Sequence, residues 1–309
     1  MSGICEGRVV IVTGAGRGIG RGHALEFARE GATVVVNDIG ADVDGSGTAD
    51  GPAGEVVDLI RAAGGTARVD GTDVSDEDGA RRLIEETVEH YGDLHVLVNN
   101  AGILRDRMIT NMTAAEWDDV IRVHLRGTFM PLRHASRYWK ERSKSGAAVD
   151  ARVINTTSSS GIYGNVGQGN YGAAKAGIAS LSIIASMELA RYGVTVNAVA
   201  PAALTRMTEN LGGNVGRKAP APGDFDPSAA DNIAPLVVWL GSEQSRDITG
   251  RVFNVRGGHI SVAEGWSAGP SFDKGARFEP GELGEVVPRL VAEAAGNAAM
   301  NGLVPEKVS

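Results

Sequence analysis

Residues 13–20 constrain the fold of this chain more than any other segment. They read Thr-Gly-Ala-Gly-Arg-Gly-Ile-Gly and directly follow the apolar run 9–12. A strand that turns tightly into a helix exposes unpaired N–H groups and a partial positive charge at the helix N-terminus. A pyrophosphate binds there if the backbone can approach it, and glycines without side chains allow that approach. Although the spacing of Gly14, Gly18 and Gly20 departs from Gly-x-Gly-x-x-Gly, it predicts a dinucleotide-binding turn; a turn without a ligand is the alternative.

The next strand-like run, residues 33–38, ends in Asp38, which lies 18 residues after Gly20. An acidic residue at this distance suits the adenosine ribose 2′-hydroxyl. A carboxylate accepts hydrogen bonds from a diol and repels a 2′-phosphate, so Asp38 favours NAD over NADP. Arg17 favours NADP, because a guanidinium beside the turn could pair with a phosphate. We give Asp38 more weight, since a carboxylate that faces the ribose must repel the phosphate.

A second cluster has the chemistry of proton transfer: Tyr171 and Lys175 are four residues apart, and Ser158 lies thirteen residues before the tyrosine. Residues at this spacing project from one face of a helix. A free tyrosine has a pKa of about 10, and a close cation favours its phenolate. The Ser158 hydroxyl can hold a substrate oxygen beside the phenol. Together the two clusters predict an enzyme that transfers a hydride between a nicotinamide ring and an alcohol or carbonyl carbon.

Apolar runs alternate with helical patterns along the chain, at residues 8–13, 33–38, 67–70, 94–98, 151–156, 193–199 and 251–255. This alternation predicts an α/β fold, a single Rossmann-like doubly wound parallel sheet with helices on both faces and a C-terminal extension. The ligand then belongs at the carboxyl ends of the strands. We expect a catalytic domain at 1–260 and an extension at 261–309 that covers the substrate loop or a subunit interface.

The amino-acid composition limits the classes of molecule that the protein is expected to bind. The 309 residues are 42% apolar, which is ample for one large core, and the net charge of −8 argues against nucleic acid or an anionic membrane. We expect no apolar run near the roughly 20 residues of a membrane span, no signal peptide and a cytoplasmic protein. The single cysteine, Cys5, excludes internal disulfides, and no two of the six histidines have the spacing of a helical metal pair. We therefore expect no metal.

The two clusters resemble the short-chain dehydrogenase/reductase family over about residues 7–260, together with matching stretches at 73–74, 99–102, 197–201 and 248–250. The resemblance implies that Asp73 contacts the adenine amino group and that Asn-Asn-Ala-Gly at 99–102 supports the sheet and the cofactor. It makes Ser158, Tyr171 and Lys175 the catalytic triad. The expected cofactor-binding residues are Gly14, Arg17, Gly18, Ile19, Gly20, Asp38, Asp73, Val74, Asn100, Ala101, Gly102, Tyr171, Lys175 and Pro201.

Two positions depart from the usual family pattern. His124 falls where most members have an asparagine that completes a proton relay, and Pro201-Ala202 replaces Pro-Gly. With residues 37–40, 102–107 and 161–165, these departures resemble a narrower branch. That branch includes the (3R)-hydroxyacyl-CoA dehydrogenase unit of multifunctional enzyme type 2, also described as 17β-hydroxysteroid dehydrogenase type 4, and its bacterial relatives. His124 is either a buried structural histidine or a relay member that holds a water next to Lys175.

The predicted substrate is a secondary alcohol, lipid-like, with a (3R)-hydroxyacyl-CoA as the first choice. A steroid, an NADPH-dependent ketoacyl reduction and a non-catalytic dinucleotide-binding subunit are the alternatives. Residues 204–230 lie where the family keeps a mobile substrate loop. The helix from Tyr171 onward is small or apolar nearly all round, so we expect it and part of 114–140 to form a homodimer or homotetramer interface. Basic candidates for binding an acyl-CoA are Arg105, Arg107, Arg206, Arg217 and Lys218.

Overall fold

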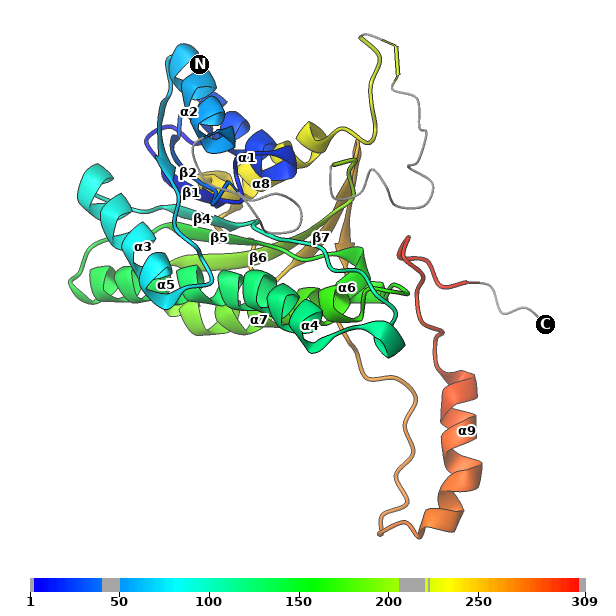
Figure 1. Cartoon of the computed structure of the whole chain (residues 1–309). Helices are drawn as coiled ribbons and strands as arrows, with labels where there is room; N and C mark the ends of the chain where they lie inside the picture. The colour runs from blue at the N-terminus through cyan, green and yellow to red at the C-terminus, as the bar shows by residue number, and fades with distance from the viewer. Residues whose placement is uncertain (1–2, 41–50, 206–219, 222, 306–309) are drawn as a thin grey trace.

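One mixed sheet forms the centre of the molecule. The computed structural model describes residues 3–40, 51–205, 220–221 and 223–305. Among these residues, eight strands pair in the order β3-β2-β1-β4-β5-β6-β7-β8; β8 alone runs antiparallel to its neighbour (Figure 1). The strands are β1 (Val9–Thr13), β2 (Thr33–Asn37), β3 (Thr66–Asp70), β4 (Val96–Asn99), β5 (Ala151–Thr156), β6 (Val194–Pro201), β7 (Val252–Arg256) and β8 (His259–Ala263). The expected doubly wound α/β fold is confirmed.

Helices cover both faces of the sheet. Helices α1 (Gly18–Arg29), α2 (Pro52–Ala62) and α8 (Ala234–Gly241) lie on one face. On the other lie α3 (Glu77–Tyr91), α4 (Ala114–Val120), α5 (Gly127–Lys144) and α7 (Gly169–Leu189). Successive side chains of a strand point to opposite faces of the sheet, so each strand contributes to both core layers. In β1, Val10 and Val12 belong to the core layer of Phe27, whereas Ile11 belongs to that of Trp139. Burial on both faces explains why the strand sequences are apolar throughout rather than alternating.

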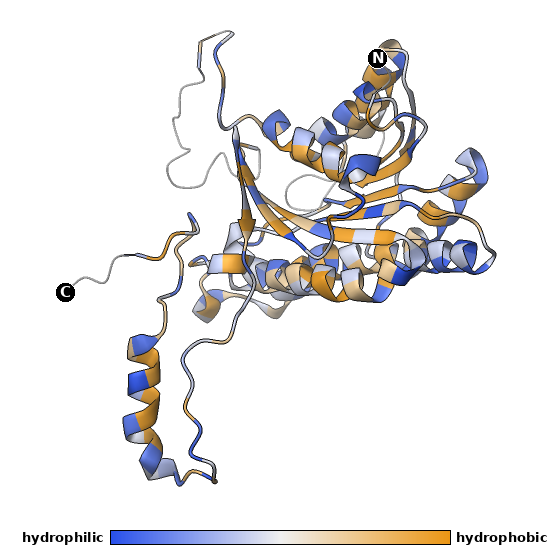
Figure 2. Ribbon diagram, turned by 180° about the vertical axis from the view of Figure 1, so that it is seen from behind, coloured by the Kyte–Doolittle hydropathy of each residue, from blue (hydrophilic) through white to orange (hydrophobic). Residues whose placement is uncertain are grey.

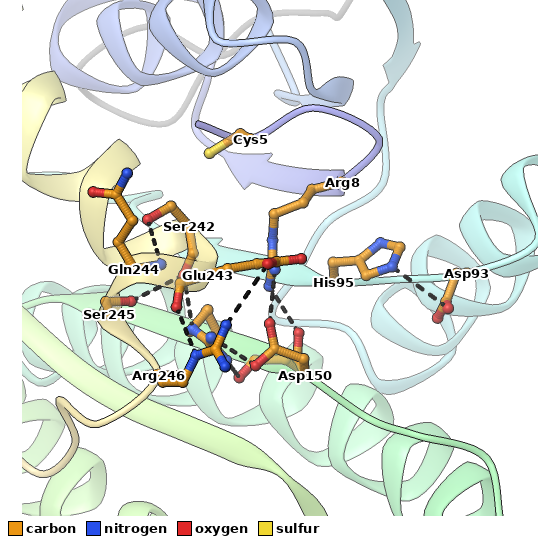
Figure 3. A network of polar contacts seen from close by, with 12 residues as sticks. Cys5, Arg8, Asp93, His95, Asp150, Ser242, Glu243, Gln244, Ser245 and Arg246 are labelled. Atoms are coloured by element: carbon orange, nitrogen blue, oxygen red, sulfur yellow. Dashed lines mark hydrogen bonds and ion pairs between the residues drawn. The ribbon is translucent and has the colours of Figure 1, made fainter. Parts of the chain in front are cut away.

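A buried ionic network lies at the amino ends of β1 and β5, at the opposite edge of the sheet from the predicted ligand (Figure 3). Arg152, 1% exposed, donates to the carbonyl of Ser242 and is 2.7 Å from the Asp150 carboxylate. Arg8 bonds to the same carboxylate at 2.9 Å. A buried charge without partners is costly. The Asp150 carboxylate, the Ser242 carbonyl and the Asp150 carbonyl provide the partners that allow both guanidinium groups to be buried.

Helix α7 corrects one expectation from the sequence. Residues Gly169–Tyr192 are long and apolar enough, by length and composition, to cross a membrane. The structure gives this helix another reason for its composition, since Ile178 and Leu189 are buried while Ile183 and Met187 on its far side are exposed. An apolar helix of this kind covers the sheet with one face and leaves a second apolar face uncovered.

The C-terminal extension does not begin where we expected. The boundary at residue 260 falls inside β8, which the sequence analysis missed, so the sheet continues to Ala263. Beyond β8 an arm leads away from the sheet and carries α9 (Leu283–Glu293), in which no residue is buried (Figures 1 and 2). The chain then returns: Met300 lines the large cleft described below, and a Cβ on Gly302 would lie 3.0 Å from the Tyr163 hydroxyl.

One sequence prediction falls partly outside the described residues. The substrate loop expected at 204–230 includes residues 206–219 and 222. Three of the basic candidates for binding an acyl-CoA, Arg206, Arg217 and Lys218, lie outside the described residues in this segment.

Candidate active site

A cleft of about 1080 Å³ lies at the carboxyl ends of the parallel strands. This is where open α/β sheets bind their ligands. Every site residue predicted from the sequence lines it: Gly14, Arg17, Gly18, Ile19, Gly20, Asp38, Asp73, Val74, Asn100, Ala101, Gly102, His124, Ser158, Tyr171, Lys175 and Pro201. The fold therefore brings together two clusters that are more than a hundred residues apart in the sequence.

The glycine turn is shaped as a phosphate-binding turn requires. Gly14 and Gly18 have φ of +62° and +54°, and a Cβ on Gly20 would lie 2.1 Å from the Gly14 carbonyl oxygen. Helix α1 begins at Gly18, and no side chain caps it at Arg17. Its first N–H groups face a cleft, and its first turn contains no acidic residue. These features fit a dinucleotide pyrophosphate.

The Asn-Asn-Ala-Gly turn after β4 holds the glycine turn in place. The Asn100 amide donates to the carbonyls of Thr13 and Gly14, at 3.1 Å each. In return the Thr13 hydroxyl accepts from the backbone N–H groups of Asn100 and Ala101. The turn thereby fixes the end of β1 against the end of β4, as the resemblance implied.

Asp38 lies where a carboxylate can select the cofactor. Its Oδ2 accepts from the Gly16 N–H and its Oδ1 from the Gly40 N–H, both at 2.8 Å. These two bonds hold the carboxylate at the end of β2, over the glycine turn. A charged acceptor in this position suits a ribose diol and repels a 2′-phosphate.

Asp73 has a partner that the sequence did not predict. Its Oδ1 accepts from the backbone N–H and the hydroxyl of Ser75, and its Oδ2 accepts from Arg122 at 3.1 Å. Arg122 also lines the cleft. Arg122 precedes His124 by two residues in a π-helical segment, Ile121–Arg126, so one irregular turn reaches both the Asp73 end and the tyrosine end of the cleft. Segments of π-helix are frequent at functional sites.

The catalytic candidates meet at the end of β5. The Ser158 side chain caps α6 (Ser159–Tyr163), because its oxygen accepts from the Ser160 N–H at 3.1 Å. Tyr171 and Lys175 are one turn apart on α7. The Lys175 Nζ lies 5.6 Å from the Tyr171 ring centroid and donates to the Thr156 carbonyl at 2.6 Å.

Burial governs the ionisation of both groups. It raises the pKa of Tyr171, which the carboxylate of Asp106 raises further, while a hydrogen bond with Ser158 lowers it. Burial also lowers the pKa of Lys175 to about 7. We expected Lys175 to lower the pKa of Tyr171, but in the protein alone the pKa of Tyr171 stands above its ordinary value. Desolvation of the phenolate outweighs the distant ammonium, which binds Thr156 instead.

His124 is neutral and enclosed. It is 2% exposed, and burial lowers its pKa to about 3, helped by the nearby charge of Lys175. The Nε2 contacts the backbone of Ile103 twice: it lies 3.1 Å from the N–H, from which it can accept, and 2.7 Å from the carbonyl oxygen, to which it can donate in the other tautomer. The Nδ1 is buried and has no hydrogen-bond partner among the described residues. Gly102 must be a glycine, because a Cβ there would lie 2.3 Å from the His124 ring.

A polar group beside the catalytic residues was also missed. Gln168 is 7% exposed and lines the cleft three residues before Tyr171. Its amide contacts Ser160, Asn165 and Asp106. Asp106 lies 62 residues from Gln168 in the chain, so no local pattern pairs them. The sequence signal for Gln168 and Asp106 was limited to their position near stretches that resemble the family.

The chain is similar to known proteins in both sequence and structure. A sequence model described as short chain dehydrogenase matches residues 8–215. Hydroxyacyl-CoA dehydrogenase ChsB1 of Mycobacterium tuberculosis is 42% identical over 264 residues, 83% of this chain and 80% of that protein. Peroxisomal multifunctional enzyme type 2 of Mus musculus is 39% identical over 84% of this chain, but only 32% of that protein is covered. The crystal structure of a short chain dehydrogenase from Mycobacterium avium is 56% identical, with a TM-score of 0.86 over 96% of this chain and 98% of that chain.

Proposed function

Since the chain belongs to the short-chain dehydrogenase/reductase family, an oxidoreductase family that acts on CH–OH groups with NAD(P), we propose that it oxidises (3R)-hydroxyacyl-CoA with NAD. The observation that carries the proposal is the convergence of Ser158, Tyr171 and Lys175 in one cleft with the glycine turn. The similarity to a hydroxyacyl-CoA dehydrogenase over most of both chains supports the substrate class.

The side chains divide the proton chemistry between them. Ser158, oriented by the Ser160 N–H, places its hydroxyl beside the phenol to hold the substrate oxygen. Tyr171 takes the hydroxyl proton as general base. Bound NAD supplies the hydride acceptor. Lys175 is anchored by its bond to the Thr156 carbonyl, and its Nζ lies 5.6 Å from the centroid of the tyrosine ring, at the cofactor side of the cleft.

His124 contributes as a positioning residue. Its ring packs edge-on against Tyr171, and its Nδ1, which has no partner among the described residues, is a buried polar atom close enough to Lys175 for the lysine charge to lower the histidine pKa. In a neutral imidazole one ring nitrogen donates a hydrogen bond and the other accepts one. We propose that Nδ1 holds a water that returns the proton from the tyrosine side to solvent.

The preference for NAD follows from Asp38. Its carboxylate is held by two backbone N–H groups at the end of β2, so the negative charge cannot move away from an incoming ribose. An NADP 2′-phosphate would meet that charge, and the nearby Arg17 does not remove it. Reduction of a ketoacyl group with NADPH remains the competing function, and Arg17 is the feature that favours it.

The arm at 264–295 supports a homo-oligomer. In α9, Leu283, Val287 and Val291 follow one another at four-residue spacing and are 38%, 47% and 68% exposed. A helix of this length is marginal in water without a partner surface. Members of the family commonly form oligomers, and we propose that a second copy of this chain covers α9 and the exposed face of α7. Light scattering tests this: a dimer or tetramer mass is expected, and a monomer at micromolar concentration contradicts it.

The direct test of the activity is Tyr171→Phe. Removing the hydroxyl should lower turnover of a (3R)-hydroxyacyl-CoA by about 10²- to 10⁴-fold. Binding of NAD, measured by fluorescence quenching, should stay close to that of the wild type because the glycine turn is untouched. Full turnover by this variant would show that Tyr171 is not the base.

A further inference from the structure

Gln168 begins α7 and has an almost fully enclosed side chain. Its backbone carbonyl accepts from the Gly172 N–H, so the residue marks the first turn of the helix that carries Tyr171. The side chain is 7% exposed and forms part of the wall of the cleft. A buried amide with four hydrogen-bonding positions has to find partners for them, or lose free energy.

The orientation of the amide is settled by its neighbours. The Asp106 carboxylate can only accept, so the nitrogen of Gln168 faces it, at 2.8 Å. The oxygen of Gln168 then accepts from the Ser160 hydroxyl at 2.7 Å and from the Asn165 amide at 2.9 Å. The amide nitrogen has two N–H bonds. Within the described part of the chain, one of these N–H bonds donates to Asp106, which leaves the other as a donor for a ligand.

This donor lies close to the reacting centre. Ser160 connects the two, since its hydroxyl bonds to Gln168 and its backbone N–H bonds to the catalytic Ser158 oxygen. A 3-hydroxyacyl thioester has a second oxygen, that of the C1 carbonyl, three bonds away from C3, the carbon that reacts. When the 3-hydroxyl is held between Ser158 and Tyr171, that carbonyl therefore remains within the same part of the cleft. A carbonyl requires a donor, which an oriented amide nitrogen provides.

We infer that Gln168 is a specificity-determining residue that donates a hydrogen bond to the thioester carbonyl of a 3-hydroxyacyl substrate, with Asp106 fixing the amide in the donating orientation. The inference rests on the proposed function and adds to it. It explains how a cleft can distinguish a 3-oxygenated thioester from a plain secondary alcohol. A site built to bond a substrate oxygen discriminates strongly against an analogue that lacks it, because its own buried polar group is then unpaired.

The test uses a matched pair of substrates and a matched pair of variants. The substrates are (3R)-hydroxyhexanoyl-CoA and its thioether analogue, in which a methylene replaces the C1 carbonyl. Wild-type kcat/KM should be roughly ten- to a hundredfold higher for the thioester, the range expected for one buried hydrogen bond. In Gln168→Met, which has a similar shape but no donor, that ratio should fall close to one. Gln168→Glu keeps the acceptor for Ser160 and Asn165 but has no N–H, and it should lose the ratio in the same way.

The control is Gln244→Met, in an exposed glutamine at the opposite edge of the sheet (Figure 3). This glutamine accepts a hydrogen bond from Trp239 and is not among the residues that line the cleft. It should keep the wild-type ratio. Because both substrates are measured on each variant, general damage to the site lowers both rates and leaves the ratio unchanged. A wild-type ratio in Gln168→Met would overturn the inference alone. Failure of the wild type to oxidise the thioester at all would overturn the proposed function and the inference together.

Discussion

The imidazole of His124 lies edge-on against the ring of Tyr171, with 5.1 Å between the ring centroids and 87° between the ring planes. The same imidazole contacts the backbone of Ile103 and would clash with any side chain at Gly102. A residue that differs from the usual family pattern is thus built into the turn that supports the cofactor cleft. The contact couples the orientation of the catalytic ring to the end of β4.

This relationship predicts different results for two substitutions at His124. His124→Asn restores the residue that the family usually has, and it should keep activity within about tenfold of the wild type because an amide oxygen can still accept a hydrogen bond. His124→Leu removes the acceptor and should lose more than that. Rates are compared at several pH values, with thermal unfolding as a check on folding. Equal losses in both variants would assign His124 a purely structural role.

Asp106 should affect the pH dependence of oxidation. Burial is the largest cause of the raised pKa of Tyr171 and the Asp106 carboxylate adds to it, so neutralising that carboxylate in Asp106→Asn should lower the pKa. The tyrosine must be deprotonated to act as a base, so the rising limb of kcat/KM for alcohol oxidation should move to lower pH. The exposed Asp118→Asn, on α4, is the control and should leave the limb in place. A limb that stays unchanged in Asp106→Asn would separate Asp106 from the base.

Asp38→Asn should weaken the preference for NAD. The variant keeps one side-chain oxygen, which can accept from either the Gly16 or the Gly40 N–H group but not from both, and it loses the negative charge. Hydrogen bonds to a charged group contribute more than neutral ones, so the Kd for NAD should rise by roughly tenfold, while binding of NADP should tighten. Titration of both cofactors measures this, with the exposed Asp58→Asn on α2 as the control. Unchanged affinities for both would place the ribose elsewhere.

The sequence predicted those elements of the fold whose burial leaves a pattern in neighbouring residues. The parallel strands were found because each is buried on both faces and is therefore a continuous apolar run, as in β1 and β2. Strand β8 was missed because it is mostly exposed, and its pattern, His-Ile-Ser-Val-Ala, is short and weakly apolar. The direction of the arm could not be predicted, because no residue of α9 is buried and its recognisable contact, Arg289 over the Phe272 ring, lies within the arm itself.

The site shows the same division. Tyr171 and Lys175 have a local spacing that only a helix makes meaningful, so the sequence was sufficient to pair them. The bond between Gln168 and Asp106 joins residues 62 positions apart, and no spacing predicts it. The pKa shifts of the catalytic candidates could not be predicted from the sequence either. Burial raises the pKa of Tyr171 and lowers that of Lys175, and only the packed fold determines burial.

His23 provides a prediction about stability. It is fully buried on α1, neither ring nitrogen has a partner in the described part of the chain, and burial lowers its pKa to about 3. Because the pKa of His23 is lower in the folded protein than in the unfolded chain, the contribution of this group to folding is fully present above the unfolded pKa. It is lost as the pH falls from there towards the folded pKa. At pH 5 the loss from this group should be roughly 2 kcal/mol. Denaturant unfolding of His23→Leu should show a weaker decline between neutral pH and pH 5, whereas the exposed His259→Leu should decline as the wild type does.

The measurement that tests the central claim most directly is initial-rate oxidation followed by the absorbance of the reduced cofactor, with NAD and NADP in parallel. Each is run against (3R)-hydroxyacyl-CoA, its (3S) isomer and a 17β-hydroxysteroid. The account predicts turnover with NAD and the (3R) thioester, and little with NADP or the (3S) isomer. Turnover of the steroid alone, or of the thioester with NADP alone, would contradict it.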